Sequence, residues 1–368
     1  MLIDAGDIDL PRKLPRLWKD GRGRLKIRPP YPNSSKSTAG WILDYMHQFW
    51  PRPEEDRQVL DYFLLTHFES DHMGDPGPDC PFSSEGNYRL SGITEVASQI
   101  SIGKIVDRAY PSYDFPIDLS RWPSNSFRNY RKFITEHVGQ NKSQVEKFDV
   151  GSKSQFTEKR NQSSDFQIRN LKSNLNVVNA NGDVVKIEGE LFTDADKFIW
   201  NENELSCAVV VEYGAFTYYE GGDQEAHRDK FGDMDTITST AKAAGPVDVA
   251  TANDHGQGVN QAFSDELDPE VIVLQGIFSD QPLKSAMTFM TRLKSDGRKR
   301  SLIATDIYEE SLQAIGDHAN GFDSTKGHIV VRVYEPGPDQ YYEIYVLGGD
   351  KRVKSMFGPF KPRSRPGR

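Results

Sequence analysis

Cysteine is scarce in this chain, and long apolar runs are missing. Only Cys80 and Cys207 occur among 368 residues, which excludes a disulfide framework and a zinc finger built from cysteines. No stretch approaches the roughly 18 to 20 apolar residues that cross a bilayer. The opening Met1–Asp7 has neither the basic nor the apolar region of a secretory signal. We therefore expect a cytoplasmic protein without a membrane segment.

The composition is that of a globular protein with an uneven distribution of charge. Hydrophobic residues make up 36% and charged residues 27%, with a formal net charge of −9, so the chain can bury a sizeable core. Two segments are nevertheless basic: residues 11–30 hold eight Lys or Arg and one Asp, and residues 351–368 hold seven and no acid. They are either solvated arms or a surface that contacts a phosphodiester or nucleic acid. Both interpretations stay open.

Hydrophobic periodicity predicts alternating helices and strands in the first third of the chain. The predicted elements are a helix over Thr38–Phe49, a strand over Val59–Thr66, a helix over Ile93–Ile102 and a strand over Lys104–Ala109. Residues 110–190 change in composition, first to aromatics and proline and then to Ser, Asn, Gln and Lys, which indicates a long insertion. Within it, Asn179–Asp183 lies between two β-branched runs and predicts a hairpin over Val177–Ile187.

The remainder of the chain has a regular strand–helix pattern. We expect strands over Ala208–Tyr213, Ala215–Tyr219, Val247–Ala252, Glu270–Leu274 and Ser301–Thr305, and a closing hairpin of Gly327–Tyr334 with Gln340–Leu347. A polar helix is expected after Asp223, and an amphipathic helix near Pro282–Leu293. This order predicts a layered α/β architecture.

Metal-competent side chains follow three of the predicted strands. The first group is His67, Glu69, Asp71 and His72; the second is Asp223; the third is Asp254 with His255. Sites of α/β proteins form at strand ends, and imidazole together with carboxylate suits Zn, Mn or Fe. Each group also has an ordinary interpretation, as a polar surface loop, a Gly-Gly-Asp turn and a structural histidine respectively. Their common position at strand ends favours a metal site.

Two segments carry a resemblance to a known family. Leu2–Gly6 together with Leu65–Gly74 resembles the metallo-β-lactamase fold signature, and Asn203–Gly214 followed by Gly222-Asp223 and His255-Gly256 is similar to the hydrolase domain of ComEC-type competence proteins. The resemblance implies an αββα sandwich of metallo-β-lactamase type with a dinuclear metal site. It implies a hydrolase domain over 1–347 with an insertion at about 110–190, followed by a basic C-terminal tail over 348–368.

The resemblance implies a ligand set with two departures from the family pattern. Glu69 stands where the signature has a second histidine, and the family's His-His-Gly-Ser is here Asp254-His255-Gly256-Gln257. The first metal position would consist of His67, Glu69 and Asp223, and the second of Asp71, His72, His255 and Asp223. We therefore expect one or two divalent ions, Zn or Mn. A carboxylate is a harder ligand than imidazole, so Glu69 should favour Mn over Zn.

Individual roles follow from this ligand set. Asp223 would bridge the ions, and Asp71 would bind an ion and orient the nucleophilic water, because a metal lowers the pKa of water. Asp4 would hold a ligating histidine through its second ring nitrogen. His227, which follows Asp223 by four residues, is expected on the surface.

Three functions stay open at this point. The leading hypothesis is a metal-dependent hydrolase of phosphodiesters or nucleic acid. The second is a hydrolase of a small ester, thioester or lactam. The third is a degenerate, non-catalytic member of the fold that binds a protein partner through residues 110–190.

Overall fold

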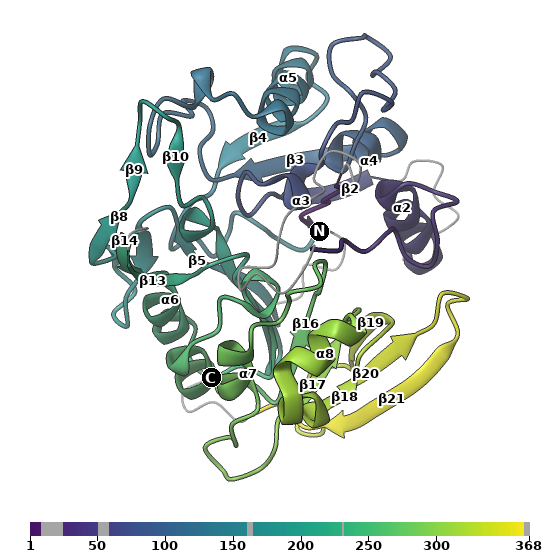
Figure 1. The fold of residues 1–368 in the computed structure, drawn as a ribbon, viewed down its shortest axis with the longest axis vertical. Helices are drawn as coiled ribbons and strands as arrows, with labels where there is room; N and C mark the ends of the chain where they lie inside the picture. Colours follow the sequence, from purple (N-terminus) through teal and green to yellow (C-terminus); the bar gives the residue numbers. More distant parts are fainter. Residues whose placement is uncertain (9–24, 51–58, 160–164, 230–231, 364–368) are drawn as a thin grey trace. The chain divides into compact units, whose positions relative to one another are not determined.

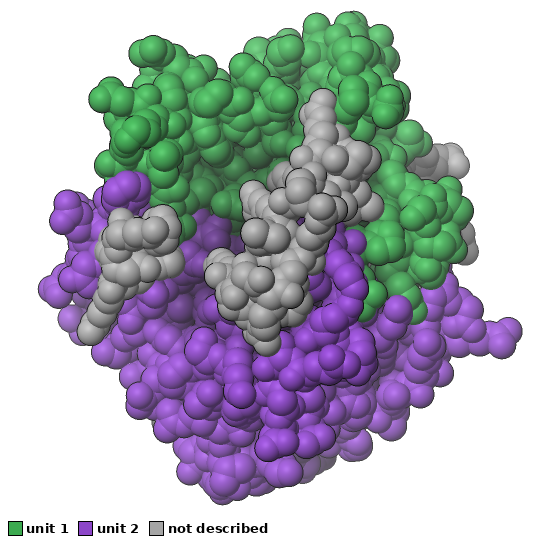
Figure 2. Space-filling model, viewed as in Figure 1, with its two compact units in different colours: residues 1–16, 28–148, 193–202 green, residues 17–27, 149–192, 203–368 purple. Residues whose placement is uncertain are grey.

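The computed structural model describes residues 1–8, 25–50, 59–159, 165–229 and 232–363. It is a mixed α/β protein with several sheets (Figure 1). The chain divides into two compact units, which Figure 2 shows in different colours. Unit 1 comprises Met1–Arg16, Arg28–Phe148 and Thr193–Glu202, and unit 2 comprises Leu17–Ile27, Asp149–Phe192 and Asn203–Arg368. A single domain over 1–347 stays a prediction.

Unit 1 is built on a parallel four-stranded sheet. Its strands, in sheet order, are β1 (Leu2–Ile3), β2 (Val59–Leu64), β3 (Ser101–Asp107) and β4 (Gln144–Lys147). Parallel neighbours need crossover connections, and helices lie between them in sequence: α2 (Thr38–Phe49), α3 (Ser70–Met73), α4 (Ile93–Gln99) and α5 (Asn125–Gly139). The helix predicted over Thr38–Phe49 and the strand that begins at Val59 are thereby confirmed.

The core of unit 1 forms where the helices cover this sheet. Phe63 and Ile105 from the strands cluster with Val96 of α4 and with Phe127 and Phe133 of α5. Helix α5 begins at a Ser124 cap, whose hydroxyl accepts a hydrogen bond from the backbone N–H of Phe127 at 3.2 Å. Two short strands, β9 (Thr193–Asp194) and β10 (Ile199–Trp200), also belong to this unit.

Unit 2 is built on a nine-stranded mixed sheet. The strands, in sheet order, are β18 (Phe322–Ser324), β17 (Ser301–Ala304), β16 (Val271–Leu274), β15 (Val249–Thr251), β12 (Phe216–Glu220), β11 (Ala208–Tyr213), β5 (Phe166–Ser173), β6 (Asn176–Val178) and β7 (Val184–Lys186). The pairs from β18 to β12 are parallel, and the pairs from β12 to β7 are antiparallel. The hairpin predicted over Val177–Ile187 is confirmed by β6 and β7.

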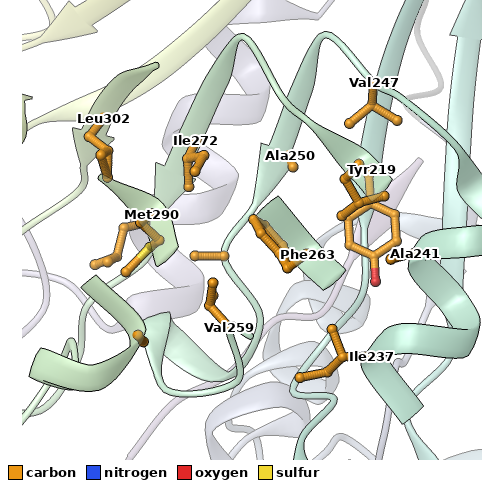
Figure 3. Close-up of a cluster of buried hydrophobic side chains, with 14 of the residues drawn as sticks. Tyr219, Ile237, Ala241, Val247, Ala250, Val259, Phe263, Ile272, Met290 and Leu302 are labelled. Carbon is orange, nitrogen blue, oxygen red and sulfur yellow. The ribbon is translucent and has the colours of Figure 1, made fainter. Parts of the chain in front are cut away.

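The two faces of this sheet are covered differently. Ala250 and Ile272 face a core that also contains Ile237 of α6 (Thr236–Ala244) and Met290 of α7 (Lys284–Met290) (Figure 3). Helix α8 (Glu309–Ile315) contributes Ile315 to the same cluster. Since side chains alternate along a strand, the neighbouring Val249 and Val271 pack on the opposite face, against a three-stranded antiparallel sheet. That sheet consists of β19 (His328–Val333), β20 (Tyr342–Leu347) and β21 (Val353–Phe360).

Two segments are more regular than their composition predicts. Residues 110–190, expected as an insertion, supply α5 to unit 1 and β5 to the interior of the nine-stranded sheet. Residues 353–360 of the expected basic tail form β21, where Phe357 and Phe360 pack against the core. The apolar residues Val353, Met356, Phe357 and Phe360, which the net charge of the tail conceals, make this strand possible.

The polar helix expected directly after Asp223 is wrong. The chain forms strands β13 (Ala226–Asp229) and β14 (Gly232–Asp235) instead, with β8 (Gly189–Leu191) as a third strand, and α6 begins only at Thr236. The N-cap of α6 is Asp235, whose carboxylate accepts a hydrogen bond from the backbone N–H of Thr238 at 2.8 Å. The helix therefore starts where a capping side chain is available.

The basic segment 11–30 lies mostly outside the described residues, since only 25–30 are described. Across the described part of the chain, no helix is both long and apolar enough to span a membrane.

Candidate metal centre

Unit 1 holds two of the predicted histidines side by side. Strand β2 ends at Leu64, and His67 follows three residues later, while His72 lies on the short helix α3. Both are buried, with exposed fractions of 0% and 7%, and their ring centroids lie 4.1 Å apart. A short loop that folds back into one helical turn therefore brings the pair together.

A chain of polar contacts orients both rings. The Nδ1 atom of His72 lies 2.7 Å from a carboxylate oxygen of Asp4. The hydroxyl of Thr66 donates to the same Asp4 oxygen at 2.7 Å and lies 3.0 Å from Nδ1 of His67. With Nδ1 engaged, each ring turns Nε2 to its opposite side, which is the arrangement of metal-binding histidines with a supporting carboxylate.

The backbone after β1 fits closely against α3. The N–H of Ala5 donates to the carbonyl of His72 at 2.9 Å. A Cβ atom at Gly6 would lie 1.4 Å from the carbonyl oxygen of Asp71, so only glycine permits this approach. Asp4 has a φ of 54°, a left-handed conformation that aspartate tolerates better than most residues. The Leu2–Gly6 segment thus serves to hold the loop that carries Asp71 and His72.

Glu69 and Asp71 differ in environment from the two histidines. Glu69 is exposed and lies at the N-cap of α3, and Asp71 is half-buried in its first turn. Glu69 also lines an open pocket of about 390 Å³ together with Phe68, Ser70, Asp75, Trp122, Ser124, Asn125 and Ser126. Metal ligation by Glu69 stays a prediction, whereas the structure places Glu69 at this open pocket.

Two residues that the sequence did not single out support this loop. Glu202 accepts a hydrogen bond from the backbone N–H of Phe68, directly after His67, at 2.8 Å. The same carboxylate also accepts hydrogen bonds from Arg108 Nε and Nη2, at 2.7 and 2.6 Å. Burial opposes the charge on Glu202, but the Arg108 guanidinium outweighs it and lowers the pKa of the carboxyl. No local pattern links residues 68 and 202, so sequence reasoning had no signal for this contact.

Unit 2 holds the second set of predicted donors. Asp223 follows β12 and is 6% exposed, and its backbone N–H donates to the hydroxyl of Ser206 at 3.1 Å. His255 Nε2 lies 3.3 Å from Asp223 Oδ2. On the other side of the ring, Nδ1 lies 2.8 Å from the carbonyl oxygen of Gln275, which directs Nε2 toward the carboxylate.

The turn that carries His255 has an unusual backbone. Asp254 and His255 both have positive φ angles, 46° and 52°, and such conformations cost about 1–3 kcal/mol each for residues other than glycine. Asp254 is buried, and this burial, together with the nearby carboxylates of Asp223 and Glu225, raises the pKa of Asp254 well above its usual range. Strain and crowded negative charge of this kind concentrate at functional sites.

His227 lies in strand β13, and its expected position on the surface stays a prediction. The other predicted residues fall into two groups: Asp4, His67, Glu69, Asp71 and His72 in unit 1, and Asp223 with His255 in unit 2. Within each group, the donors combine imidazole and carboxylate and are buried or half-buried, apart from the exposed Glu69. This chemistry fits a divalent transition metal.

Comparison with known proteins gives little further information. The sequence matches no family model, and no curated protein matches it. Among solved structures, the chain is similar to the 1.98-angstrom crystal structure of Zn(2+)-bound PqqB from Methylobacterium extorquens. The sequence identity is 10%, the match covers 72% of this chain and 71% of that chain, and the TM-score is 0.32. A TM-score of this size does not establish a common fold, and the zinc is a property of that protein.

Proposed function

We propose that this protein is a metal-dependent hydrolase with the ligand set that its sequence predicts. Asp71, His72, Asp223 and His255 would bind one Zn or Mn ion, and His67 with Glu69 would extend the site to a second. The observation that carries the proposal is the contact of Asp4 with His72 Nδ1 at 2.7 Å. A carboxylate in this position fixes the tautomer of an imidazole and raises its basicity toward a cation.

The catalytic roles follow from the positions of these residues in the chain. A divalent ion would supply the nucleophile by lowering the pKa of a water molecule. Asp71, half-buried in the first turn of α3, would orient that water and accept its proton. Asp223, whose backbone N–H is anchored on Ser206, would contact both ions. Asp4 and Thr66 would keep the two unit 1 histidines in a single orientation.

A phosphodiester is the substrate class that we favour. The scissile phosphate carries negative charge, and the basic residues at both ends of the chain would attract it. The scissile group of a small ester, thioester or lactam is uncharged, so these basic residues would not attract it. The open pocket beside Glu69 and Ser70, with its aromatic and hydroxyl-bearing lining, offers space for the group attached to the phosphate.

Metal analysis of protein purified without added metal tests the centre itself. We expect about one to two ions per chain of Zn or Mn, and Asp223→Ala should lose most of them because this carboxylate would touch both ions. Asp339→Ala, which removes an exposed carboxylate of unit 2, is the matched control and should keep full occupancy. An Asp223→Ala protein with unchanged metal content would show that the site is misplaced.

A substrate panel at fixed metal concentration tests the reaction. A chromogenic phosphodiester, an ester, a thioester and a β-lactam are compared, and only the diester should be cleaved, with the activity lost on chelation. Cleavage of an ester, thioester or lactam alone would favour the second hypothesis. If the purified protein contains no metal and cleaves none of the substrates, the hypothesis of a non-catalytic binding protein is favoured.

A further inference from the structure

Helix α5 of unit 1 has a polar, positively charged face opposite its buried one. Asn125, Arg128, Asn129 and Lys132 follow one another at the spacing i, i+3, i+4 and i+7, which places them on one side of a helix. Arg128 and Lys132 are exposed. The opposite side of the helix is fixed in the core by its buried residues, Phe127, Tyr130, Phe133 and Ile134.

This face forms one wall of an open pocket of about 510 Å³. The facing wall comes from the segment between α3 and α4 and consists of Pro76, Gly77, Pro78, Phe82, Asn87, Tyr88 and Arg89. Three of the lining side chains are cationic, three are amides, and none of the described lining residues is acidic. In a protein with a net charge of −9, such a concentration of positive charge is a specific local feature.

Side-chain contacts hold the two walls together. The Asn129 side chain pairs with the backbone of Arg89 twice, accepting from its N–H at 2.8 Å and donating to its carbonyl at 2.9 Å. The Arg89 guanidinium lies 4.1 Å from the ring centroid of Phe82 and donates to the carbonyl of Cys80 at 2.5 Å. The pocket is therefore preorganised, which reduces the entropic cost of binding a ligand.

We propose that this pocket binds a nucleotide unit of a single-stranded nucleic-acid substrate. Arg128 and Lys132 would contact the phosphates, and Phe82, which is 55% exposed, would stack with a base. Asn87 Nδ2 donates to Glu136 and Asn125 Oδ1 accepts from Arg128, so the Asn87 carbonyl oxygen and the Asn125 amino group would be the atoms that face a base edge. A pocket of this volume accommodates a group of nucleotide size. An acidic peptide would use the two cations but not the exposed ring.

The position of the pocket relates it to the candidate metal site. Asn125 lines both this pocket and the one that contains Glu69 and Ser70, next to Asp71. A strand bound along α5 would thus extend toward the loop that carries Asp71 and His72, within the same unit. The inference rests on the proposed hydrolase function and names its substrate class.

The test measures the binding of a fluorescein-labelled oligothymidylate to the full-length protein by fluorescence anisotropy. A chelator is present so that the oligonucleotide is not cleaved during the measurement. The Arg128→Gln/Lys132→Gln variant should bind roughly three- to tenfold more weakly. The plot of log K against log salt should become shallower by about 1.4, because each lost phosphate contact with a single strand removes about 0.7 from the magnitude of its negative slope. Phe82→Ala should weaken binding by about fivefold or more with an unchanged slope. The matched control is Lys153→Gln/Lys299→Gln, which removes two exposed lysines outside the pocket and should bind as the parent does.

The outcomes separate this inference from the proposed function. Hydrolysis of the small chromogenic diester does not require the pocket, so the double variant should retain it. Equal affinity and salt slope in the parent and the Arg128→Gln/Lys132→Gln protein would overturn the inference while leaving the hydrolase proposal intact. Tighter binding of a glutamate-rich peptide of equal charge than of the oligothymidylate would also overturn it. Loss of affinity in the double variant together with a parent that cleaves no diester would support the pocket and count against the proposed reaction.

Discussion

Arg108 and Glu202 form a buried ion pair in unit 1, with two parallel hydrogen bonds at 2.7 and 2.6 Å. The side chain of Arg108 is 0% exposed and that of Glu202 is 5% exposed. Arg108 also donates to the carbonyl of Phe115 at 3.0 Å, and Glu202 accepts from the backbone N–H of Phe68. The pair therefore connects three segments, one of which follows directly on His67.

We predict that Glu202→Gln destabilises the protein by about 3–5 kcal/mol, because it leaves the Arg108 charge buried without its counter-ion. Urea unfolding, followed by circular dichroism, measures the loss. The double variant Arg108→Met/Glu202→Leu removes both charges and should be less destabilised than Glu202→Gln. Equal destabilisation of the single and double variants would contradict this account of the pair.

Asp4→Asn should weaken metal binding by about 10- to 100-fold while the fold is retained. Asparagine tolerates the left-handed φ of 54° at this position but does not provide the negative charge that faces His72. Metal titration by calorimetry, with circular dichroism as a check of folding, gives the answer. Asp183→Asn, in an exposed hairpin turn, is the control. If the Asp4→Asn variant binds metal with unchanged affinity, Asp4 does not contribute to metal binding.

Glu69 should shift the metal preference of the first position from Zn toward Mn, since a carboxylate is harder than imidazole. Glu69→His should raise zinc affinity, and Glu69→Ala should lower occupancy of the first position. Zinc and manganese titrations of the parent and both variants measure this. Identical isotherms in all three proteins would mean that Glu69 is not a ligand and serves only the pocket that it lines.

The stability of the protein should fall as the pH decreases from about 6.5 to about 4, in part because of His137. Burial, with a smaller contribution from Lys142, lowers the pKa of His137 from 6.5 to about 4. Between these values the unfolded state binds a proton that the folded state does not, so acid favours unfolding. The buried ring also lies 3.0 Å from the hydroxyl of Ser143.

The measurement is the urea midpoint between pH 4 and pH 7 for the parent and for His137→Gln. Glutamine can hydrogen-bond to Ser143 but does not titrate, so the variant should depend less on pH over this interval. Parallel curves for the two proteins would show that His137 does not contribute to the acid sensitivity.

Local sequence predicted most of the regular elements. Thr38–Phe49 is helical over the expected range, because apolar residues at helical spacing follow a capping Ser37 and precede Pro51. The same reasoning is wrong after Asp223, where a polar stretch predicts a helix but the chain forms the β13–β14 hairpin. A polar and charged composition indicates that a segment is exposed to solvent, but an exposed segment can be either a strand or a helix.

The pattern of polar residues along the chain predicts the candidate metal ligands without any knowledge of the structure. It grouped His67, Asp71 and His72 in one loop, because side chains a few residues apart remain close in any compact conformation. It also placed Asp223 and His255 at strand ends, because an apolar run followed by polar residues marks the end of a buried strand.

The contacts that orient these side chains depend on the three-dimensional structure. The Asp4–His72 distance of 2.7 Å and the Phe68–Glu202 hydrogen bond join residues 68 and 134 positions apart in sequence. The cationic pocket likewise requires Arg89 to pack against Asn129, 40 residues away. Such contacts depend on how strands and helices pack, and this packing is set by the burial of apolar surface across the whole unit. No short-range pattern in the sequence encodes them.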